Sequence, residues 1–84
     1  MKPFRDPGFN PCLDALPAKI QIQAKRQFKL LQSNPRHPSL HFKRLHGTLW
    51  SVRAGRSYRA LAKEVDGDFQ WFWIGPHKAY DKMI

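Results

Sequence analysis

The dipeptide Asp66-Gly67 constrains the fold of this chain more than any other feature. A two-residue type I′ turn needs residues that tolerate positive φ, and Asp-Gly is one of the pairs that proteins prefer there. Apolar and polar residues alternate on both sides of the pair, so we expect a hairpin with strands at about residues 57–65 and 68–74. The pairs His46-Gly47 and Gly55-Arg56 mark two further turns, and they predict strands at about residues 40–46 and 48–54.

The two-residue turn also predicts the register of this hairpin. With Val65 opposite Asp68, small residues face large ones on one side of the sheet, which is the pattern of a core. The predicted pairs on that side are Ala62 with Trp71 and Ala60 with Trp73. The other side is predicted to be a working surface, and it carries Arg59, Leu61, Lys63, Gln70, Phe72 and Ile74.

An amphipathic helix is predicted before the sheet, at about residues 17–32. Its apolar residues recur every three to four positions, at Leu16, Ile20, Ala24, Phe28 and Leu31. Asp14 is expected to cap its start. The first 17 residues contain four prolines and predict an irregular lead-in, with room for a short edge strand near Lys2 to Arg5. The predicted class is α+β, in which an N-terminal helix or helical hairpin packs on a twisted antiparallel sheet of about four strands, and residues 1–84 form a single domain.

The charge distribution points to an anionic ligand. The chain has 84 residues and a formal net charge of +9, and its six acidic residues all lie outside residues 15–63. That stretch carries eleven Lys or Arg residues, so its folded surface attracts anions. Aromatic residues interleave these cations, and charge for phosphates with rings for unstacked bases is the combination that binds single-stranded RNA.

Other compartments and ligand classes find less support. No apolar run approaches the roughly 20 residues of a membrane span, and the chain lacks the apolar stretch of a signal peptide, so we expect a cytoplasmic protein without a membrane partner. Cys12 is the only cysteine, which excludes an intrachain disulfide and a cysteine zinc cluster. His37 and His41 flank a proline in extended chain, which removes the helical spacing of a metal-binding pair. We expect no metal and no cofactor.

The residues that remain for chemistry are cations and protic groups on neighbouring predicted strands and in the C-terminal tail: Lys43, Arg44, Arg53, Tyr58, Arg59, His77 and Tyr80. RNA carries its own nucleophile in the 2′-hydroxyl, so a ribonuclease needs only a base, an acid and cations around the phosphate. The carboxylates of Glu64, Asp66 and Asp68 gather at a hairpin tip, which makes a carboxylate hydrolase a poor fit. These residues alone leave catalysis and simple RNA binding equally open.

The turn at Gly55-Arg56 decides whether two of these cations share a site. A strict two-residue turn puts Arg53 on the face of Tyr58, opposite to Arg59. A three-residue bulged turn brings Arg53 and Arg59 to one face. We expect the bulge or a longer loop.

Four segments follow one another in a characteristic order: residues 37–45 (HPSLHFKRL), 49–53 (LWSVR), 57–61 (SYRAL) and 73–81 (WIGPHKAYD). In this order they resemble the RelE/ParE superfamily of toxins from type II toxin–antitoxin pairs, and the likeness extends from Leu16-Pro17 to the end of the chain. The resemblance implies a compact α+β domain in which helices pack on a twisted antiparallel sheet. It also implies an acidic cognate antitoxin that holds the toxin inactive.

The resemblance leaves three functions to compare. The first is an endoribonuclease that cuts mRNA, often on the ribosome, and so inhibits translation. The second is a ParE-like toxin that acts on DNA gyrase without nuclease chemistry, and the third is an inactive member that only binds RNA. We expect the first.

For the endoribonuclease, the resemblance implies four catalytic residues: Arg53, Arg59, His77 and Tyr80. The two arginines stabilise the scissile phosphate, and the histidine and tyrosine supply acid or base function. The residues expected to bind RNA are Lys43, Arg44, Tyr58, Lys25, Arg26 and Lys29. The general base is not assigned to a residue.

Overall fold

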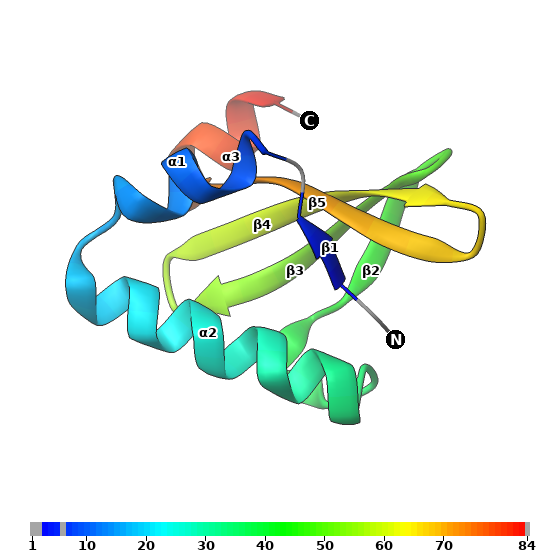
Figure 1. Ribbon diagram of the computed structural model, residues 1–84, viewed down its shortest axis with the longest axis horizontal. Helices are drawn as coiled ribbons and strands as arrows, with labels where there is room; N and C mark the ends of the chain where they lie inside the picture. Colours follow the sequence, from blue (N-terminus) through cyan, green and yellow to red (C-terminus); the bar gives the residue numbers. More distant parts are fainter. Residues whose placement is uncertain (1–2, 6, 84) are drawn as a thin grey trace.

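The computed structural model describes residues 3–5 and 7–83 and contains a five-stranded sheet with helices packed on it (Figure 1). The elements in chain order are β1 (Pro3–Arg5), α1 (Phe9–Asp14), α2 (Ala18–Ser33), the 3-10 turn η1 (Pro38–Leu40), β2 (Lys43–His46), β3 (Leu49–Gly55), β4 (Tyr58–Val65), β5 (Asp68–Pro76) and α3 (His77–Met83). The strands lie in the order β1-β5-β4-β3-β2. β1 runs parallel to β5, and the other neighbours are antiparallel. The predicted α+β class is confirmed.

The core lies between the sheet and the two helices α1 and α2. Alternate residues of β3, β4 and β5 meet apolar side chains from both helices in one buried cluster: Phe9, Leu13, Ala24, Phe28, Leu31, Leu40, Val52, Ala54, Ala60, Ala62, Phe69, Trp71 and Ile74. The ring of Phe28 links the layers, because it packs edge-on against Phe9 at 5.5 Å and against Trp71 at 5.1 Å. Such edge-to-face pairs add about 0.5–1.5 kcal/mol beyond the burial of apolar area.

The β4–β5 hairpin has the turn that the sequence predicts. Asp66 and Gly67 take φ values of 52° and 82°, as a type I′ turn requires. Val65 lies opposite Asp68, and Ala62 lies opposite Trp71. These parts of the predicted register are confirmed.

Farther along the hairpin the predicted register is wrong. A register shift between Leu61 and Ala62 pairs Leu61 with Trp73, so Phe72 is an extra residue on β5. Ala60 therefore faces Ile74 rather than Trp73. Ile74 is buried in the core instead of lying on the working surface.

The bulge also places the indole of Trp73 over Gly75. A Cβ added to Gly75 would lie 2.5 Å from Cζ2 of Trp73, which is closer than carbon atoms approach each other. Gly75 therefore makes room for this indole on the side of the sheet opposite to α1 and α2.

The ends of the chain depart most from prediction. The main helix is confirmed at Ala18–Ser33, but Pro17 is its N-cap, and Asp14 ends α1 instead of capping α2. The lead-in, which was predicted to be irregular, contains α1, a helix whose position was not predicted. The edge strand is confirmed at Pro3–Arg5, and Lys2 lies outside the described residues. The first predicted strand starts at Lys43, because residues 38–40 form a 3-10 turn.

Candidate functional site

Arg53 and Arg59 share one face of the sheet. A register shift between Arg53 and Gly55 pairs Gly55 with Tyr58, so Arg53 lies directly opposite Arg59. The expected bulge is confirmed, and with it the placement of both arginines on one face. Alternation along β4 puts Arg59 on the side away from the core residue Ala60, so the pair faces away from α1 and α2.

The guanidinium group of Arg59 lies in an unfavourable environment for positive charge, to which Arg53 contributes. Partial burial and the neighbouring charge of Arg53 lower the pKa of Arg59, and Tyr80 and Asp81 act weakly in the opposite direction. Arg59 Nη1 donates to the carbonyl oxygen of Tyr58 at 3.1 Å. Arg53 Nε is buried and has no hydrogen-bond partner among the described residues. Like charges directly opposite in a sheet are destabilising, so this pair is arranged to receive an anion.

A cleft of about 560 Å³ opens beside the arginine pair. It is bounded by the β3–β4 turn on one side and by the start of α3 on the other. The described residues that line it are Arg53, Arg56, Ser57, Tyr58, Arg59, Pro76, His77 and Lys78. Four of these are permanently cationic and none is acidic, which suits a phosphate. We call this space the first cleft.

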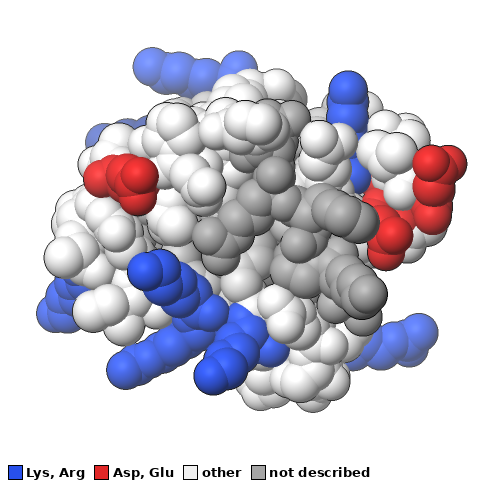
Figure 2. Space-filling view, in the orientation of Figure 1, with Lys and Arg blue, Asp and Glu red and all other residues white. Residues whose placement is uncertain are grey.

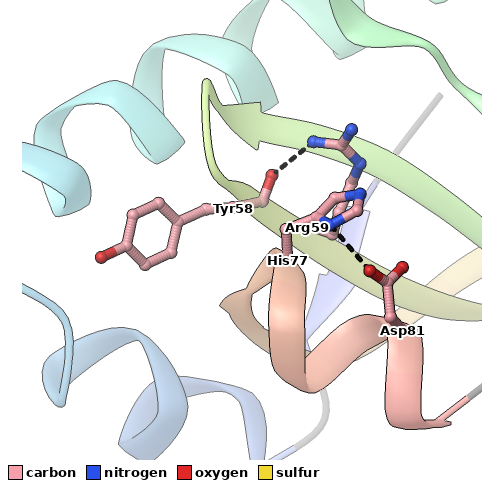
Figure 3. A network of polar contacts seen from close by, with 4 residues as sticks. All are labelled: Tyr58, Arg59, His77 and Asp81. Carbon is pink, nitrogen blue, oxygen red and sulfur yellow. Dashed lines mark hydrogen bonds and ion pairs between the residues drawn. The ribbon is translucent and has the colours of Figure 1, made fainter.

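His77 is held at the edge of the first cleft by an acidic residue of its own helix. Its Nδ1 lies 3.0 Å from a carboxylate oxygen of Asp81, one turn along α3 (Figure 3). Nε2 is therefore the ring nitrogen that Asp81 does not contact. The ring centroid of Tyr80 lies 5.7 Å from that of His77. Tyr80 is only 5% exposed and does not line the cleft. The buried tyrosine ring thus packs beside the histidine ring.

The structure brings some of the predicted site residues together and separates others. Arg53, Arg59 and His77 line one cleft. The ring of Tyr58 points away from Arg59 and His77, and packs against the core (Figure 3). Lys43 pairs with Ser51 and so shares the face of Arg53, although it does not line the first cleft.

The remaining residues predicted to bind RNA are exposed on β2 and α2. Arg44 pairs with Trp50, whose ring packs on the core side of the sheet. Lys25, Arg26 and Lys29 are exposed on α2, where blue side chains gather along the lower edge of Figure 2. Arg26 lines a cleft that also contains Arg53. The acidic side chains seen in Figure 2 lie apart from this edge, with a group at the β4–β5 hairpin tip.

Three residues of the site were not predicted from the sequence. Arg56 and Lys78 line the first cleft, and Asp81 contacts His77. The spacing of His77 and Asp81, four residues apart, would have indicated this ion pair if the tail had been predicted as a helix. Nothing in the sequence of the β3–β4 turn indicates that Arg56 points into a cleft.

Two kinds of feature are absent from the described residues. No group of three or more His, Cys, Asp or Glu side chains comes close enough to hold a metal ion within this part of the chain. None of the described helices has the length and apolar character needed to cross a membrane.

Comparisons with known proteins agree with this fold. Residues 18–82 match the family model of the ParE-like toxin domain. The RelB-RelE antitoxin-toxin complex from Methanococcus jannaschii contains a chain of similar fold, with a TM-score of 0.75, 15% identity, and coverage of 96% of this chain and 98% of that one. YafQ from E. coli gives a TM-score of 0.72, 13% identity and coverage of 94% and 96%.

The isolated RelE toxin of E. coli is also similar, with a TM-score of 0.64, 13% identity and coverage of 98% of this chain and 97% of that one. A comparison with curated protein sequences gave no match. At these identities the structural likeness establishes the fold, and the family model extends over most of the chain.

Proposed function

This chain belongs to the ParE-like toxin domain family, within the RelE/ParE superfamily, and on that premise we propose that it is the toxin of a type II toxin–antitoxin pair and an endoribonuclease that cleaves mRNA without a metal ion. The observation that carries the ribonuclease activity is the first cleft. It combines two directly opposed arginines with a histidine and has no acidic residue among its described lining. Cations and a proton donor are what RNA cleavage by its own 2′-hydroxyl needs from a protein.

The proposed reaction is an internal transesterification. The 2′-hydroxyl gives its proton to a water molecule and its oxygen attacks the adjacent phosphorus, so a P–O2′ bond forms and the P–O5′ bond breaks. The leaving 5′-oxygen takes a proton from His77. The products are a 2′,3′-cyclic phosphate and a free 5′-hydroxyl, so atoms and charge balance without an oxidant or a cofactor.

Each residue has a separate part in this reaction. Arg53 and Arg59 stabilise the negative charge that grows on the phosphorane, and losing one such contact slows a reaction by about 10²–10³. His77 acts as the general acid, a role worth about 10²–10⁴ in rate. Asp81 holds the His77 ring in place, and Tyr80 supports it rather than touching the RNA. Arg56 and Lys78 position the strand.

The proposed partners follow from the same surface. An mRNA, bound free or on the ribosome, supplies the phosphate. A cognate antitoxin supplies an acidic segment, because a chain with a net charge of +9 attracts acidic partners with fast, salt-sensitive association. The two similar complexes from Methanococcus jannaschii and Pyrococcus horikoshii pair RelE with RelB. We expect the antitoxin to cover the cleft arginines.

Induced expression in cells tests the proposal against its main rival. The toxin should cleave transcripts and arrest translation before any DNA-damage response, and R59A and H77A should each abolish this effect. K19A serves as the control, because Lys19 is an exposed cation on α2 that lines neither cleft. DNA damage with intact transcripts would show that the chain acts on gyrase and would refute the ribonuclease proposal.

A further inference from the structure

A second cleft of about 530 Å³ adjoins the first. Its described lining consists of Gln23, Arg26, Gln27, Ser39, Arg53, Gly55 and Arg56. Arg53 and Arg56 line both clefts, so the two spaces adjoin at these residues. A ligand that follows these cations passes from α3, across the β3–β4 turn, to α2.

The second cleft is built around the part of β3 that β2 does not cover. β2 pairs with β3 only as far as Ser51, and beyond it the carbonyl oxygen of Arg53 accepts a hydrogen bond from Gln27 Nε2 at 3.2 Å. The same nitrogen donates to the carbonyl oxygen of Ser39 at 3.3 Å. Gln27 therefore fixes α2 against the edge of β3, and its Oε1 is left as an acceptor.

Gly55 gives the Gln23 side chain its place in this cleft. A Cβ added to Gly55 would lie 2.9 Å from Gln23 Oε1, so only glycine leaves the carboxamide where it is. The Gln23 carboxamide can both donate and accept, and a glutamine carboxamide matches the paired donor and acceptor on the edge of a nucleobase.

The charge of the second cleft matches that of the first. Arg26, Arg53 and Arg56 are its ionisable lining residues, and its described lining holds no acidic side chain. A second phosphate of the same strand would meet guanidinium groups there, and the neighbouring base would meet two carboxamides and the Ser39 backbone. Phosphate contacts position a strand, whereas contacts to base edges select its sequence.

We infer that the second cleft is a nucleotide subsite for the RNA strand whose scissile phosphate occupies the first cleft. Arg26 and Arg56 hold the phosphate next to the scissile one, and Gln23 and Gln27 hydrogen bond to the edge of the adjoining base. The inference rests on the proposed function, because it takes RNA as the ligand. It adds that base preference is read by side chains of α2, which take no part in the chemical step.

Direct binding of RNA that cannot be cleaved tests the subsite separately from catalysis. The probes are a fluorescent hexanucleotide and a dinucleotide, both 2′-O-methylated at every position. The variants are R26A, Q23A and the control K19A, which removes the same unit of charge as R26A from the same helix. Binding is measured by fluorescence anisotropy at several salt concentrations, and thermal melting checks that each variant is folded.

We expect R26A to weaken hexanucleotide binding about tenfold. R26A should also make the slope of log K against log salt shallower by about 0.7, the value for one phosphate contact to a single strand. Q23A should weaken binding to some base sequences and not others, with the salt slope unchanged. K19A should leave the slope as it is, and the dinucleotide should bind all variants equally.

The inference fails if R26A and Q23A bind the hexanucleotide as K19A does, even where the wild-type protein cleaves RNA. The proposed function fails instead if R26A and Q23A behave as expected but the wild-type protein cleaves no RNA. A protein that binds neither probe also refutes the inference, whereas the proposed function is tested by cleavage of mRNA, free and on ribosomes. A folded Q23A that loses affinity equally for every sequence refutes the reading of the base by Gln23.

Discussion

Replacing Arg53 by methionine should stabilise the protein while it impairs function. Methionine keeps an unbranched apolar stem but removes the guanidinium group. The change relieves two unfavourable features of the folded state, which are the charge of Arg53 opposite Arg59 and the buried Arg53 Nε that lacks a partner among the described residues. Proteins retain such unfavourable features at sites where a bound ligand relieves them.

The gain has two parts. Directly opposed like charges in a sheet cost about 0.2–1 kcal/mol, and an unsatisfied buried donor costs about 1–3 kcal/mol. We therefore expect R53M to raise the free energy of unfolding by at least about 1 kcal/mol, which corresponds to a Tm increase of about 4–8 °C for a domain of this size.

Raising the pH does not relieve the repulsion between the two arginines as the R53M substitution does. The lowered pKa of Arg59 means that the folded state disfavours its charge. This cost is present at every pH below the folded-state pKa, and it is lost only as the pH rises through that value. Since an arginine stays charged under all ordinary conditions, only substitution or a bound anion removes the repulsion.

Thermal melting at low and high salt, with R56M as the matched control, checks this expectation. Arg56 lines the same clefts but lies exposed in the turn, so its loss should change Tm little. The R53M gain should shrink at 1 M salt, where the Debye length falls to about 3 Å and repulsion is screened. An R53M protein that melts below wild type, or no higher than R56M, would refute the account of the arginine pair.

Three further expectations concern other parts of the molecule. G75A should destabilise the protein by about 1–3 kcal/mol, because its Cβ would displace the indole of Trp73, and urea denaturation measures this loss; an unchanged midpoint would contradict the placement of Trp73. D81A should reduce the rate of RNA cleavage without changing the KM, and by less than H77A does, because Asp81 acts through His77; a raised KM would instead place Asp81 in RNA binding. The antitoxin should raise the Tm of the toxin and should bind R53M/R59M more weakly, as calorimetry can measure, since it binds only the folded toxin; equal melting temperatures with and without it would count against a partner on this surface.

The sequence predicted the parts of the fold that depend on local geometry. Asp66-Gly67 predicted the turn and its first residue pairs, because few residues accept its backbone angles. A bulged turn at Gly55-Arg56 predicted that Arg53 and Arg59 share a face, which is the central feature of the site. Side chains alternate between the two faces of a strand, so the length of a turn determines which residues of its two strands pair.

The parts that were missed depend on packing between distant segments. Phe69, Trp71, Phe72 and Trp73 are aromatic on both faces of β5, so alternation could not show which residue forms the bulge. α1 was hidden by its proline content, although Pro11 lies in the first turn of that helix, where a missing N–H costs nothing. The second cleft could not be predicted at all, because Gln23 and Arg56 meet only when α2 docks on β3.

The most direct test of the central claim is the chemistry of RNA cleavage by the purified protein. The substrate is an mRNA cleaved in EDTA, free and on ribosomes, and its counterpart carries a single 2′-deoxynucleotide at the mapped cleavage position. The account predicts cleavage in EDTA that leaves a 2′,3′-cyclic phosphate, is blocked by the single 2′-deoxy substitution, and is lost in R59A and H77A. Cleavage that requires a divalent metal ion, or that persists at the 2′-deoxynucleotide, would contradict it.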